Sequence, residues 1–441
     1  MNINELKKRI ADAGCVGAGG AGFPTAVKVA EGADSLIINA AECEPLLYTD
    51  YYVMKRAMER IASGAETVME AAGIPNGYLG VKAHTAKRLG LSHGDAVSSH
   101  VKVHILPDVY PMGDEIILIY QVLGRVVTPG SLPLSAGVLV FNAETLYNVD
   151  RAVKEGLPVT EKWVTIGGKV ARPVSLKVPV GTGVAELFAH LGVSVPEGCV
   201  VIDGGPAMGP VINPDTAVIT KTTKGLLILP DDIPAITSKL SQNRAVMAHA
   251  SSNCCQCTLC SEMCPRALIG YPLRPHKIVR TSLSLVEEMP EAFTEAQVCS
   301  ACGVCELTAC CQGISPRRVY AQVKGILAKN KLRYQHKGEI TVDPDREYRM
   351  LPSDRFMTRI GVAPFDAVPD FLPDGYVPSR VTLPMRQHVG APAAPAVKAG
   401  DTVRAGDIVG AAAGVVSANI HAPVSGRVAS ADAGAVVIVT A

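Results

Sequence analysis

The sequence predicts a multidomain α/β protein, and three observations support this fold class. The chain has 441 residues, which is longer than a single hydrophobic core usually accommodates. Hydrophobic residues make up 48% of it and charged residues 19%, as in folded globular proteins rather than disordered ones. Ten of the 13 cysteines lie between Cys254 and Cys311, which sets that region apart from the rest of the chain.

Residues 1–160 are expected to form an α/β layered domain. Short apolar runs at residues 35–40, 101–106 and 137–143 predict strands, and the periodic stretch 51–73 between them predicts a helix. The N-terminal segment predicts a short amphipathic helix and lacks the apolar core of a signal peptide.

The rest of the chain divides by composition. Residues 161–235 predict a small β-rich module with one helix, and residues 236–340 hold the cysteines among helical segments. Residues 341–380 are rich in Pro and Asp and have little periodicity, which is typical of a linker. Residues 381–441 have little charge and many Gly and β-branched residues, and they predict a small all-β domain.

The overall charge and hydropathy exclude some classes of partner. A net charge of +1 gives no basic surface for nucleic acid or for an anionic membrane. No apolar run reaches the roughly 18 residues that a transmembrane helix needs. We therefore expect a cytoplasmic protein with no transmembrane segment and no nucleic-acid partner.

The first cysteine cluster has the spacing of an iron–sulfur loop. It reads Cys254-x2-Cys257-x2-Cys260-x3-Cys264-Pro265, the run found in bacterial ferredoxins. Three thiolates at this spacing hold three corners of one [4Fe–4S] cluster, and the fourth serves the other cluster. Zinc ribbons use paired C-x2-C knuckles instead, and disulfide staples are spread through small secreted chains. The spacing therefore predicts iron–sulfur ligation.

A second run, Cys299-x2-Cys302-x2-Cys305, repeats the pattern and is followed by Cys310 and Cys311. Its last interval is one residue longer, so the fourth ligand is Cys310 or, as the less favoured choice, Cys311. Two [4Fe–4S] clusters are expected, one on Cys254, Cys257, Cys260 and Cys310, and the other on Cys299, Cys302, Cys305 and Cys264.

The other cysteines are not expected to bind metal. Cys255 and Cys311 are surplus to the two clusters, and we interpret them as packing residues or spare thiols. Cys15 and Cys199 stand alone in the sequence and are expected to be small buried residues.

A glycine-rich loop, GCVGAGGAGFPTAVK, occupies residues 14–28. Its Gly17-x-Gly19-x-x-Gly22 spacing matches the dinucleotide fingerprint, but a predicted helix precedes it where a standard Rossmann turn needs a strand. Backbone N–H groups in such a loop can still approach a phosphate closely, and Lys28 adds a positive charge. A glycine turn without a ligand is the alternative interpretation.

The loop and three later motifs resemble a family of electron-transfer flavoproteins. GAGGAGFPTAVK (17–28), NAAECEP (39–45), YPMGDE (110–115) and FNAETL (141–146) occur in this order. The set is similar to that of the NADH-oxidising flavoprotein subunit of respiratory complex I and of the C subunit of the Rnf electron-transport complex. The resemblance implies a Rossmann-like flavin domain, and residues 201–229 resemble the β-grasp module that follows it in those proteins. A ferredoxin-like helical domain with two clusters would then come next.

The resemblance also implies an FMN site that faces an NADH site. Its catalytic residues would be Glu42, Glu44 and Glu115. Its cofactor-binding residues would be Gly17, Gly19, Gly20, Phe23, Lys28, Asn39, Tyr110, Gly113, Asn142 and Thr145. Phe23 would stack on a nicotinamide or adenine ring. Ala18 stands where the family loop often carries Arg. A solvated strand end for the two glutamates of NAAECEP, and a core position for Phe23, are the alternatives.

The C-terminal segment resembles a barrel-sandwich hybrid, the fold of biotinyl and lipoyl carriers. A carrier needs a lysine at a hairpin tip, and no lysine lies between Asp407 and Arg427, so we expect no swinging arm. His388 and His421 are expected at the surface or in turns rather than as cobalt ligands. The similar module of the Rnf C subunit is N-terminal, whereas a C-terminal position resembles the cobalamin reductases of propanediol-utilisation microcompartments.

These resemblances imply one electron path. NADH would reduce FMN, the two [4Fe–4S] clusters would carry single electrons, and cobalamin would be reduced from Co(III) towards Co(I) to recycle B12 for a diol dehydratase. A microcompartment shell protein and an adenosyltransferase would be the protein partners, inside a bacterial microcompartment. The alternatives are the electron-input subunit of a membrane ferredoxin:NAD oxidoreductase complex and a non-catalytic iron–sulfur scaffold.

Overall fold

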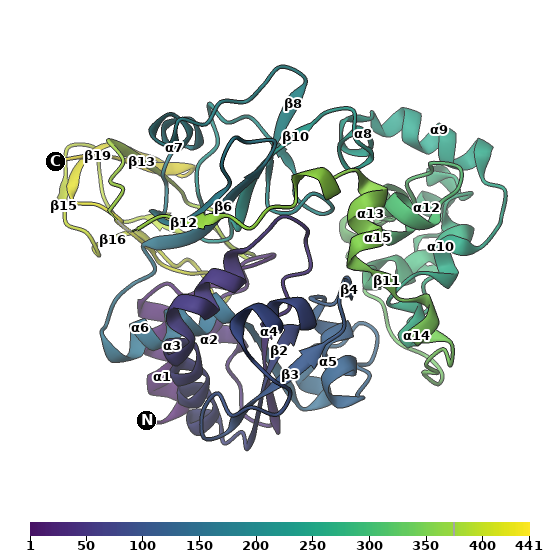
Figure 1. Cartoon of the computed structure of the whole chain (residues 1–441), viewed down its shortest axis with the longest axis horizontal. Helices are drawn as coiled ribbons and strands as arrows, with labels where there is room; N and C mark the ends of the chain where they lie inside the picture. Colours follow the sequence, from purple (N-terminus) through teal and green to yellow (C-terminus); the bar gives the residue numbers. More distant parts are fainter. Residues whose placement is uncertain (374) are drawn as a thin grey trace.

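The computed structural model describes residues 1–373 and 375–441 (Figure 1). Its first part is a parallel four-stranded sheet in the order β3-β2-β1-β5. The strands are β1 (Ser35–Ala40), β2 (Asn76–Lys82), β3 (Val101–Leu106) and β5 (Val138–Asn142). The predicted strands at 35–40 and 101–106 are confirmed, and the third predicted strand lies within 137–143. Because all four strands are parallel, their carboxyl ends meet at one edge, where ligands of α/β sheets bind.

Helices cover both faces of this parallel sheet. They are α1 (Ile3–Asp12), α2 (Thr25–Lys28), α3 (Thr49–Ala72), α4 (Ala83–Leu89), α5 (Glu115–Leu123) and α6 (Ala143–Lys154), with the 3-10 turn η1 (Pro133–Ala136). α1 and α3 confirm the two predicted helices. On one face, α1, α3 and α6 bury apolar residues such as Leu6, Ile61 and Leu146 against the sheet. On the other face, Leu118 of α5 shares a core with Tyr320 and Val319 of the cysteine region.

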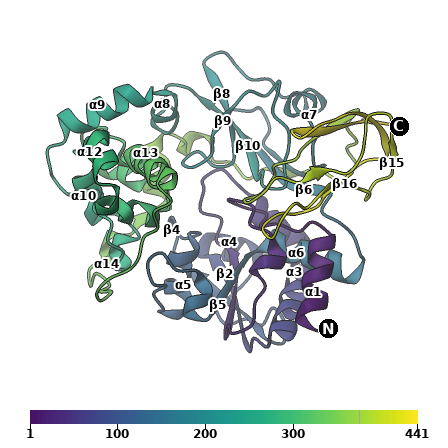
Figure 2. The ribbon, with the colours of Figure 1, turned by 180° about the vertical axis from the view of Figure 1, so that it is seen from behind.

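A six-stranded mixed sheet follows in the order β12-β7-β6-β10-β8-β9. Its strands are β6 (Glu161–Gly168), β7 (Val174–Pro179), β8 (Cys199–Asp203), β9 (Val211–Ile212), β10 (Gly225–Pro230) and β12 (Asp370–Phe371), and α7 (Val184–Leu191) packs on it. The short β12 comes from far along the chain and pairs with β7 at the edge of the sheet. Figures 1 and 2 show this sheet between the cysteine region and the C-terminal strands.

The cysteine region is helical, as predicted. It contains α8 (Pro234–Leu240), α9 (Asn243–Asn253), α10 (Leu259–Glu262), α11 (Pro275–Ile278), α12 (Leu283–Glu288) and α13 (Pro316–Lys329), with 3-10 turns η2 (Ala267–Ile269) and η3 (Pro290–Val298) and a π-helical turn η4 (Cys305–Ala309). α13 confirms the helix expected within 317–332. No helix in residues 1–373 and 375–441 is both long and apolar enough to span a membrane.

Residues 341–380, which we expected to be a linker, are largely packed against the rest of the molecule. They form α14 (Arg346–Arg349), β11 (Leu351–Pro352), α15 (Ser353–Ile360), the 3-10 turn η5 (Ala363–Phe365) and β12. β11 pairs with β4 (Val109–Tyr110). Phe356 and Ile360 are fully buried, because their spacing of four residues places both on the inner face of α15.

The C-terminal residues form two small antiparallel sheets (Figure 2). One consists of β13 (Arg380–Pro384), β19 (Ala435–Thr440), β18 (Gly426–Ala431) and β15 (Thr402–Val403), and the other of β14 (Ala394–Pro395), β16 (Ile408–Ala411) and β17 (Ile420–His421). Alternate apolar residues of both sheets, among them Leu383, Val409 and Ile438, meet in one buried core. The expected all-β character of this segment is confirmed.

Candidate functional site

A cavity of about 360 Å³ opens at the carboxyl ends of β1 and β5. Its wall is formed by the glycine-rich loop, by the segment that follows β1, by the start of α5, and by Lys224 just before β10. All of the predicted flavin-site and catalytic residues line it except Tyr110. Four motifs that are far apart in the sequence therefore meet at one place.

The glycine-rich loop is crowded at some positions and conformationally restricted at others. A Cβ atom at Gly19 would lie 2.9 Å from Cε of Lys224 and 3.4 Å from Nδ2 of Asn142. Gly20 has a φ of +72°, which disfavours residues other than glycine. The loop is held from beneath, because the Ala18 N–H donates to Oγ1 of Thr145 at 3.0 Å. Its backbone can thus face a ligand directly.

Lys224 connects two acidic residues of the cavity. Its Nζ lies 2.6 Å from Oδ2 of Asp50 and 3.3 Å from Oε1 of Glu42. Burial raises the pKa of Glu42 to about 7, although the Lys224 charge opposes this. Burial alone would lower the pKa of Lys224, but the Asp50 and Glu42 carboxylates outweigh it and raise that pKa. The lysine therefore stays charged and compensates two carboxyl groups in a dry site.

Two buried polar atoms in this wall have no hydrogen-bond partner within the described residues. They are Oγ1 of Thr25 and Oδ1 of Asp50. Buried polar groups in proteins are nearly always paired, so unpaired ones next to a cavity indicate a polar ligand. Lys28 is placed by an ion pair of 3.1 Å with Glu115, and the ring of Phe23 is 38% exposed. Phosphate, ribityl hydroxyls and a planar ring all find suitable groups here, so the cavity fits FMN.

Glu44 lies in the same wall and is fixed by backbone groups. Its carboxylate accepts hydrogen bonds from the N–H groups of Ala207 at 2.9 Å and Met208 at 3.0 Å. Burial raises the pKa of Glu44. The carbonyl oxygen of Ala207 in turn accepts from Nη1 of Arg317 at 2.7 Å, and Arg317 also lines a cysteine-containing cavity. The acidic residue is thus linked to the cysteine region.

Tyr110, which we expected to close the pocket, is buried behind Glu44 instead. Its hydroxyl donates to the backbone oxygen of Cys302 at 2.7 Å and lies 3.4 Å from Oε1 of Glu44. Its ring stacks on Phe356 of α15 with 4.0 Å between the centroids. This tyrosine therefore spans the distance between the cavity wall and a cysteine group.

The structure brings the predicted cluster ligands together in two groups, each lining a small cavity. One group consists of Cys254, Cys257, Cys260 and Cys310, and the other of Cys264, Cys299, Cys302 and Cys305. We refer to them as the outer and the inner cysteine group. Cys260 of the outer group and Cys305 of the inner group pack in one apolar contact with Ala309, so the two groups adjoin.

The two cysteine loops share an unusual backbone conformation. In the outer loop, Gln256 and Thr258 have φ values of 57° and 65°, and in the inner loop Ala301 and Gly303 have 59° and 86°. Each middle cysteine is thus flanked by left-handed residues on both sides. Non-glycine residues adopt this conformation at a cost of about 1–2 kcal/mol each. The repeated strain turns successive thiols towards one centre, as a metal cluster requires.

The donor set of each group fits an iron–sulfur cluster. Burial, followed by the neighbouring thiols, raises the pKa of Cys260 to about 11 and that of Cys264 to about 12. Such thiols ionise when they bind metal, and four thiolates are the usual ligands of a [4Fe–4S] cluster. Backbone N–H groups also point at sulfur, from Ala301 to Cys299 at 3.4 Å and from Ile314 to Cys310 at 3.3 Å.

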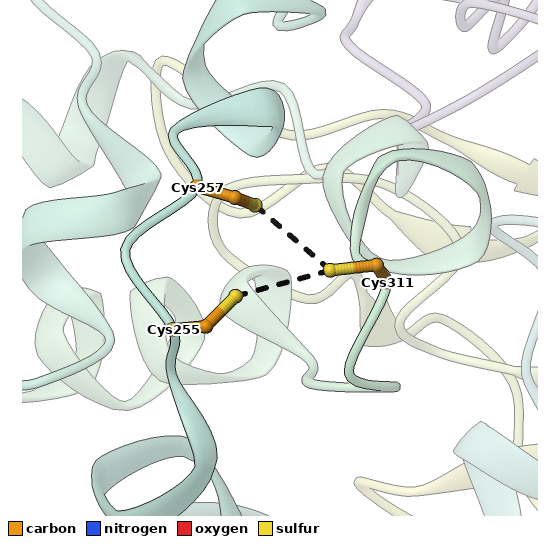
Figure 3. Close-up of side chains that lie close together, drawn as sticks. All are labelled: Cys255, Cys257 and Cys311. Atoms are coloured by element: carbon orange, nitrogen blue, oxygen red, sulfur yellow. Dashed lines mark hydrogen bonds between the residues drawn. The ribbon is translucent and has the colours of Figure 1, made fainter.

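Three exposed thiols lie close together: Cys257 of the outer group and its neighbours Cys255 and Cys311 (Figure 3). Sγ of Cys311 is 3.9 Å from Sγ of Cys255 and 4.0 Å from Sγ of Cys257. Cys255 and Cys311 are exposed, which argues against a packing role, and both also line the outer cavity, so their role as spare thiols stays a prediction. Elsewhere Cys15 is buried as expected, but Cys199 is partly exposed at the start of β8.

The C-terminal sheets pack against the glycine-rich loop. A Cβ atom at Gly22 would lie 3.0 Å from the backbone oxygen of Gln387, and Nζ of Lys221 donates to the carbonyl oxygens of Gly14 and Asn419, both at 2.7 Å. His388 and His421, which we expected at the surface, are both buried. The two histidines are enclosed because the barrel packs on the glycine-rich loop, so this side of the barrel does not face solvent.

Sequence reasoning missed several residues of the cavity wall. Thr25 lies inside the motif 17–28 but was not singled out, whereas Asp50 and Lys224 have no motif of their own, and Lys224 is 174 residues from its Asp50 partner. Cys43 also lines the cavity, and its position inside NAAECEP was the one available signal.

Family models match three separate parts of the chain. Residues 10–151 match the Nuo51 FMN-binding domain, residues 253–315 match a 4Fe-4S dicluster domain, and residues 372–438 match the RnfC barrel sandwich hybrid domain. The chain therefore has an FMN-binding domain, a two-cluster iron–sulfur domain and a C-terminal barrel-sandwich hybrid.

Full-length relatives define the family. The cobalamin reductase PduS of Salmonella typhimurium is 37% identical over 445 residues, which cover 100% of this chain and 97% of that protein. The chain belongs to the PduS family. PduS of Citrobacter freundii is likewise 37% identical, over 96% of this chain and 94% of its own length. Likeness outside the PduS family is partial: the C subunit of the ion-translocating oxidoreductase complex of Rhodobacter capsulatus is 34% identical over 61% of this chain and 51% of its own.

Proposed function

We propose that this chain is an NADH-dependent cobalamin reductase, which passes electrons from NADH to the cobalt of a corrinoid. The observation that carries the proposal is the match to PduS cobalamin reductases along the whole chain. The cavity, the two cysteine groups and the contacts between them support it, because they supply a hydride-accepting site and a route for single electrons.

At the cavity, the loop residues Gly19 and Gly20 would offer backbone N–H groups and Lys28 would offer a positive charge to the phosphate of FMN. The partly exposed ring of Phe23 is placed to stack on the nicotinamide or adenine of NADH. Glu42 and Glu44 line the side on which the hydride arrives, and Lys224 keeps Glu42 in place. When bound, FMN accepts a hydride as an electron pair and [4Fe–4S] clusters carry electrons singly.

The contacts of Tyr110 give the two cysteine groups an order. The inner group is next to the cavity wall, because Tyr110 joins the Cys302 backbone to Glu44. The outer group adjoins the inner one through Cys260 and Cys305, and it lies beside the exposed Cys255 and Cys311. Electrons would therefore enter through the inner group and leave through the outer group.

The same proposal assigns the parts of the chain and their surroundings. Residues 1–160 would be a Rossmann-like FMN and NADH domain, 161–235 a β-grasp module and 236–340 a ferredoxin-like domain. Residues 341–380 would connect it to the barrel at 381–441. A microcompartment shell protein and an adenosyltransferase would be its partners, as the resemblance to the cobalamin reductases of propanediol-utilisation microcompartments implies.

An anoxic assay tests the function. Protein that is fully loaded with FMN and iron is mixed with NADH and cob(III)alamin, and the absorbance of cob(II)alamin is followed. We expect reduction that depends on both NADH and the protein. Loaded protein that is bleached by NADH but leaves cob(III)alamin unchanged would refute it.

A second candidate is the electron-input subunit of a membrane ferredoxin:NAD oxidoreductase, because the C subunits of such complexes are partial relatives. Affinity purification from the native host separates the two. Recovery with microcompartment shell proteins supports the reductase, whereas recovery with membrane subunits supports the alternative.

A further inference from the structure

A larger cavity, of about 670 Å³, lies beside the outer cysteine group. It is bounded by the end of α8, by α9, by the turn η4 and the residues after it, and by Arg359 of α15. Cys310 lines both this cavity and the small cavity of the outer group. A ligand seated here would thus touch a residue that we assign to the last cluster of the route.

The rim of this cavity is held in a defined shape. Arg318 donates through Nη1 to the carbonyl oxygen of Ser238 at 2.7 Å and through Nη2 to that of Ser241 at 2.7 Å. Glu306 in the wall is neutralised by Arg317, with 3.0 Å between Oε2 and Nε. These contacts fix the end of α8 against α13 and leave no uncompensated acid in the wall.

Three polar groups of the wall have no partner within the residues that the structure describes. The guanidinium of Arg359 has no acceptor among them, the ring of His249 has no hydrogen bond, and the buried Oγ of Ser238 is unpaired. A free cation, an imidazole and hydroxyl groups around a cavity of this size are typical of a binding site for a polar molecule with an anionic group. A molecule bound here would lie beside Cys310, which we assign to the outer cluster, so it would be placed to accept an electron.

We propose that this cavity is the corrinoid site, an inference that rests on the proposed cobalamin reductase function. A corrinoid carries peripheral amides, which suit His249 and the hydroxyl groups, and cobalamin also carries a phosphodiester, which suits Arg359. The cavity is open along exposed residues such as Thr237 and Ala245, so a large ligand can seat one part in it. Cys310 and the other residues of the outer group would hold the cluster that donates one electron, which would take Co(III) of the bound corrinoid to Co(II) without any bond to the protein being formed.

Four variants of the FMN- and iron-loaded protein test the site. Ala245→Trp fills the cavity, and Ala248→Trp is its control, because Ala248 is exposed on the same helix but outside the wall. Arg359→Gln removes the cation, and Arg355→Gln is its control on α15, again exposed and outside the wall. Binding of cyanocobalamin is measured by equilibrium dialysis without NADH. Reduction of ferricyanide by NADH is measured separately, because it reports whether electrons still pass from NADH through FMN and the clusters.

We expect Ala245→Trp and Arg359→Gln to weaken cyanocobalamin binding about tenfold or more, with iron content and ferricyanide reduction unchanged. Both controls should bind like the parent protein. Cobinamide, which lacks the phosphodiester, should bind equally to the parent and to Arg359→Gln. Parent-like cobalamin binding by Ala245→Trp overturns the site, as does binding that appears only when an adenosyltransferase is added.

The two proposals fail in distinguishable ways. If the parent protein reduces cobalamin and Ala245→Trp does so with the same KM, only the site is wrong. If the parent protein reduces ferricyanide but not cobalamin, the proposed function is wrong.

Discussion

The hydroxyl of Tyr110 donates to the backbone oxygen of Cys302 at 2.7 Å, and it lies 3.4 Å from the carboxylate of Glu44. One buried side chain therefore contacts both the wall of the FMN cavity and the inner cysteine group. Its ring is stacked on Phe356, so it has little freedom to move. Tyr110 thus joins the FMN cavity wall to the inner cysteine group, although it is not itself a predicted ligand of the iron.

Tyr110→Phe should leave the Cys302 carbonyl without a donor. A buried unpaired polar group costs about 1–3 kcal/mol, so we expect a lower thermal midpoint and slower oxidation of the flavin by the inner cluster. Stopped-flow absorbance after mixing with NADH measures the rate. Tyr320→Phe is the control, because Tyr320 lines the inner cavity and its hydroxyl forms no hydrogen bond within the described residues. Equal rates in both variants would contradict the role of Tyr110.

Cys310→Ser and Cys311→Ser should differ in iron content. Both cysteines line the outer cavity, but Cys310 is partly buried and its sulfur accepts a backbone N–H, whereas Cys311 is exposed beside Cys255. We expect Cys310→Ser to lose about four of the eight iron atoms of two [4Fe–4S] clusters and Cys311→Ser to lose none. Iron and sulfide analysis after anaerobic reconstitution measures this. The reverse result would make Cys311 the ligand.

Lys224→Met should remove the charge that compensates Glu42 and Asp50. Breaking a buried ion pair by removing one partner costs about 3–5 kcal/mol, so we expect a loss of stability and of bound FMN. The combined variant Lys224→Met, Glu42→Gln, Asp50→Asn should recover most of the stability. Lys102→Met, at an exposed position of β3, is the surface control. If Lys224→Met has normal stability, the prediction is wrong, and the carboxyl groups of Glu42 and Asp50 are then protonated when the lysine charge is removed.

His421 should make a destabilising contribution in mild acid. Burial, assisted by the charge of Lys221, lowers the pKa of this histidine to about 4, against about 6.5 in the unfolded chain. Between these values the unfolded chain binds a proton at His421 that the folded protein does not, so the contribution of His421 to stability is lost as the pH falls from 6.5 towards 4. That contribution amounts to about 2 kcal/mol between pH 7 and pH 5. The raised pKa of Glu42 acts in the opposite direction, so the contribution is measured as the difference between the parent protein and a variant. His421→Gln should flatten this part of the pH profile, measured as unfolding midpoints in urea.

Elements with a strong local pattern could be predicted from the sequence. The apolar run 35–40 and the long periodic stretch around α3 needed no tertiary information, and the cysteine spacing placed all eight proposed ligands in two groups. β2 was not predicted, because Gly77 and Gly80 interrupt its apolar pattern. Gly77 is favoured there since a Cβ atom would lie 2.7 Å from Cγ2 of Val101 and 3.0 Å from the backbone oxygen of His100.

Contacts between distant elements could not be predicted. The role of Lys224 depends on Asp50 and Glu42, which are close to it in space but far from it along the chain. No local sequence spacing encodes this contact. Tyr110 belongs to a recognised motif, but its orientation is set by α15, which lies more than 200 residues later. The histidines of the C-terminal sheets are buried for a similar reason, because the surface that covers them comes from the N-terminal segment.

The contacts of Lys221 with Gly14 and Asn419 place the barrel beside both ends of the chain, and the amide of Asn419 also lies 3.4 Å from the carbonyl oxygen of Ala11. Release of the barrel from the N-terminal segment would therefore leave the carbonyl oxygens of Gly14 and Asn419 without their shared lysine, and the start of the glycine loop would lose its support from the C-terminal sheets.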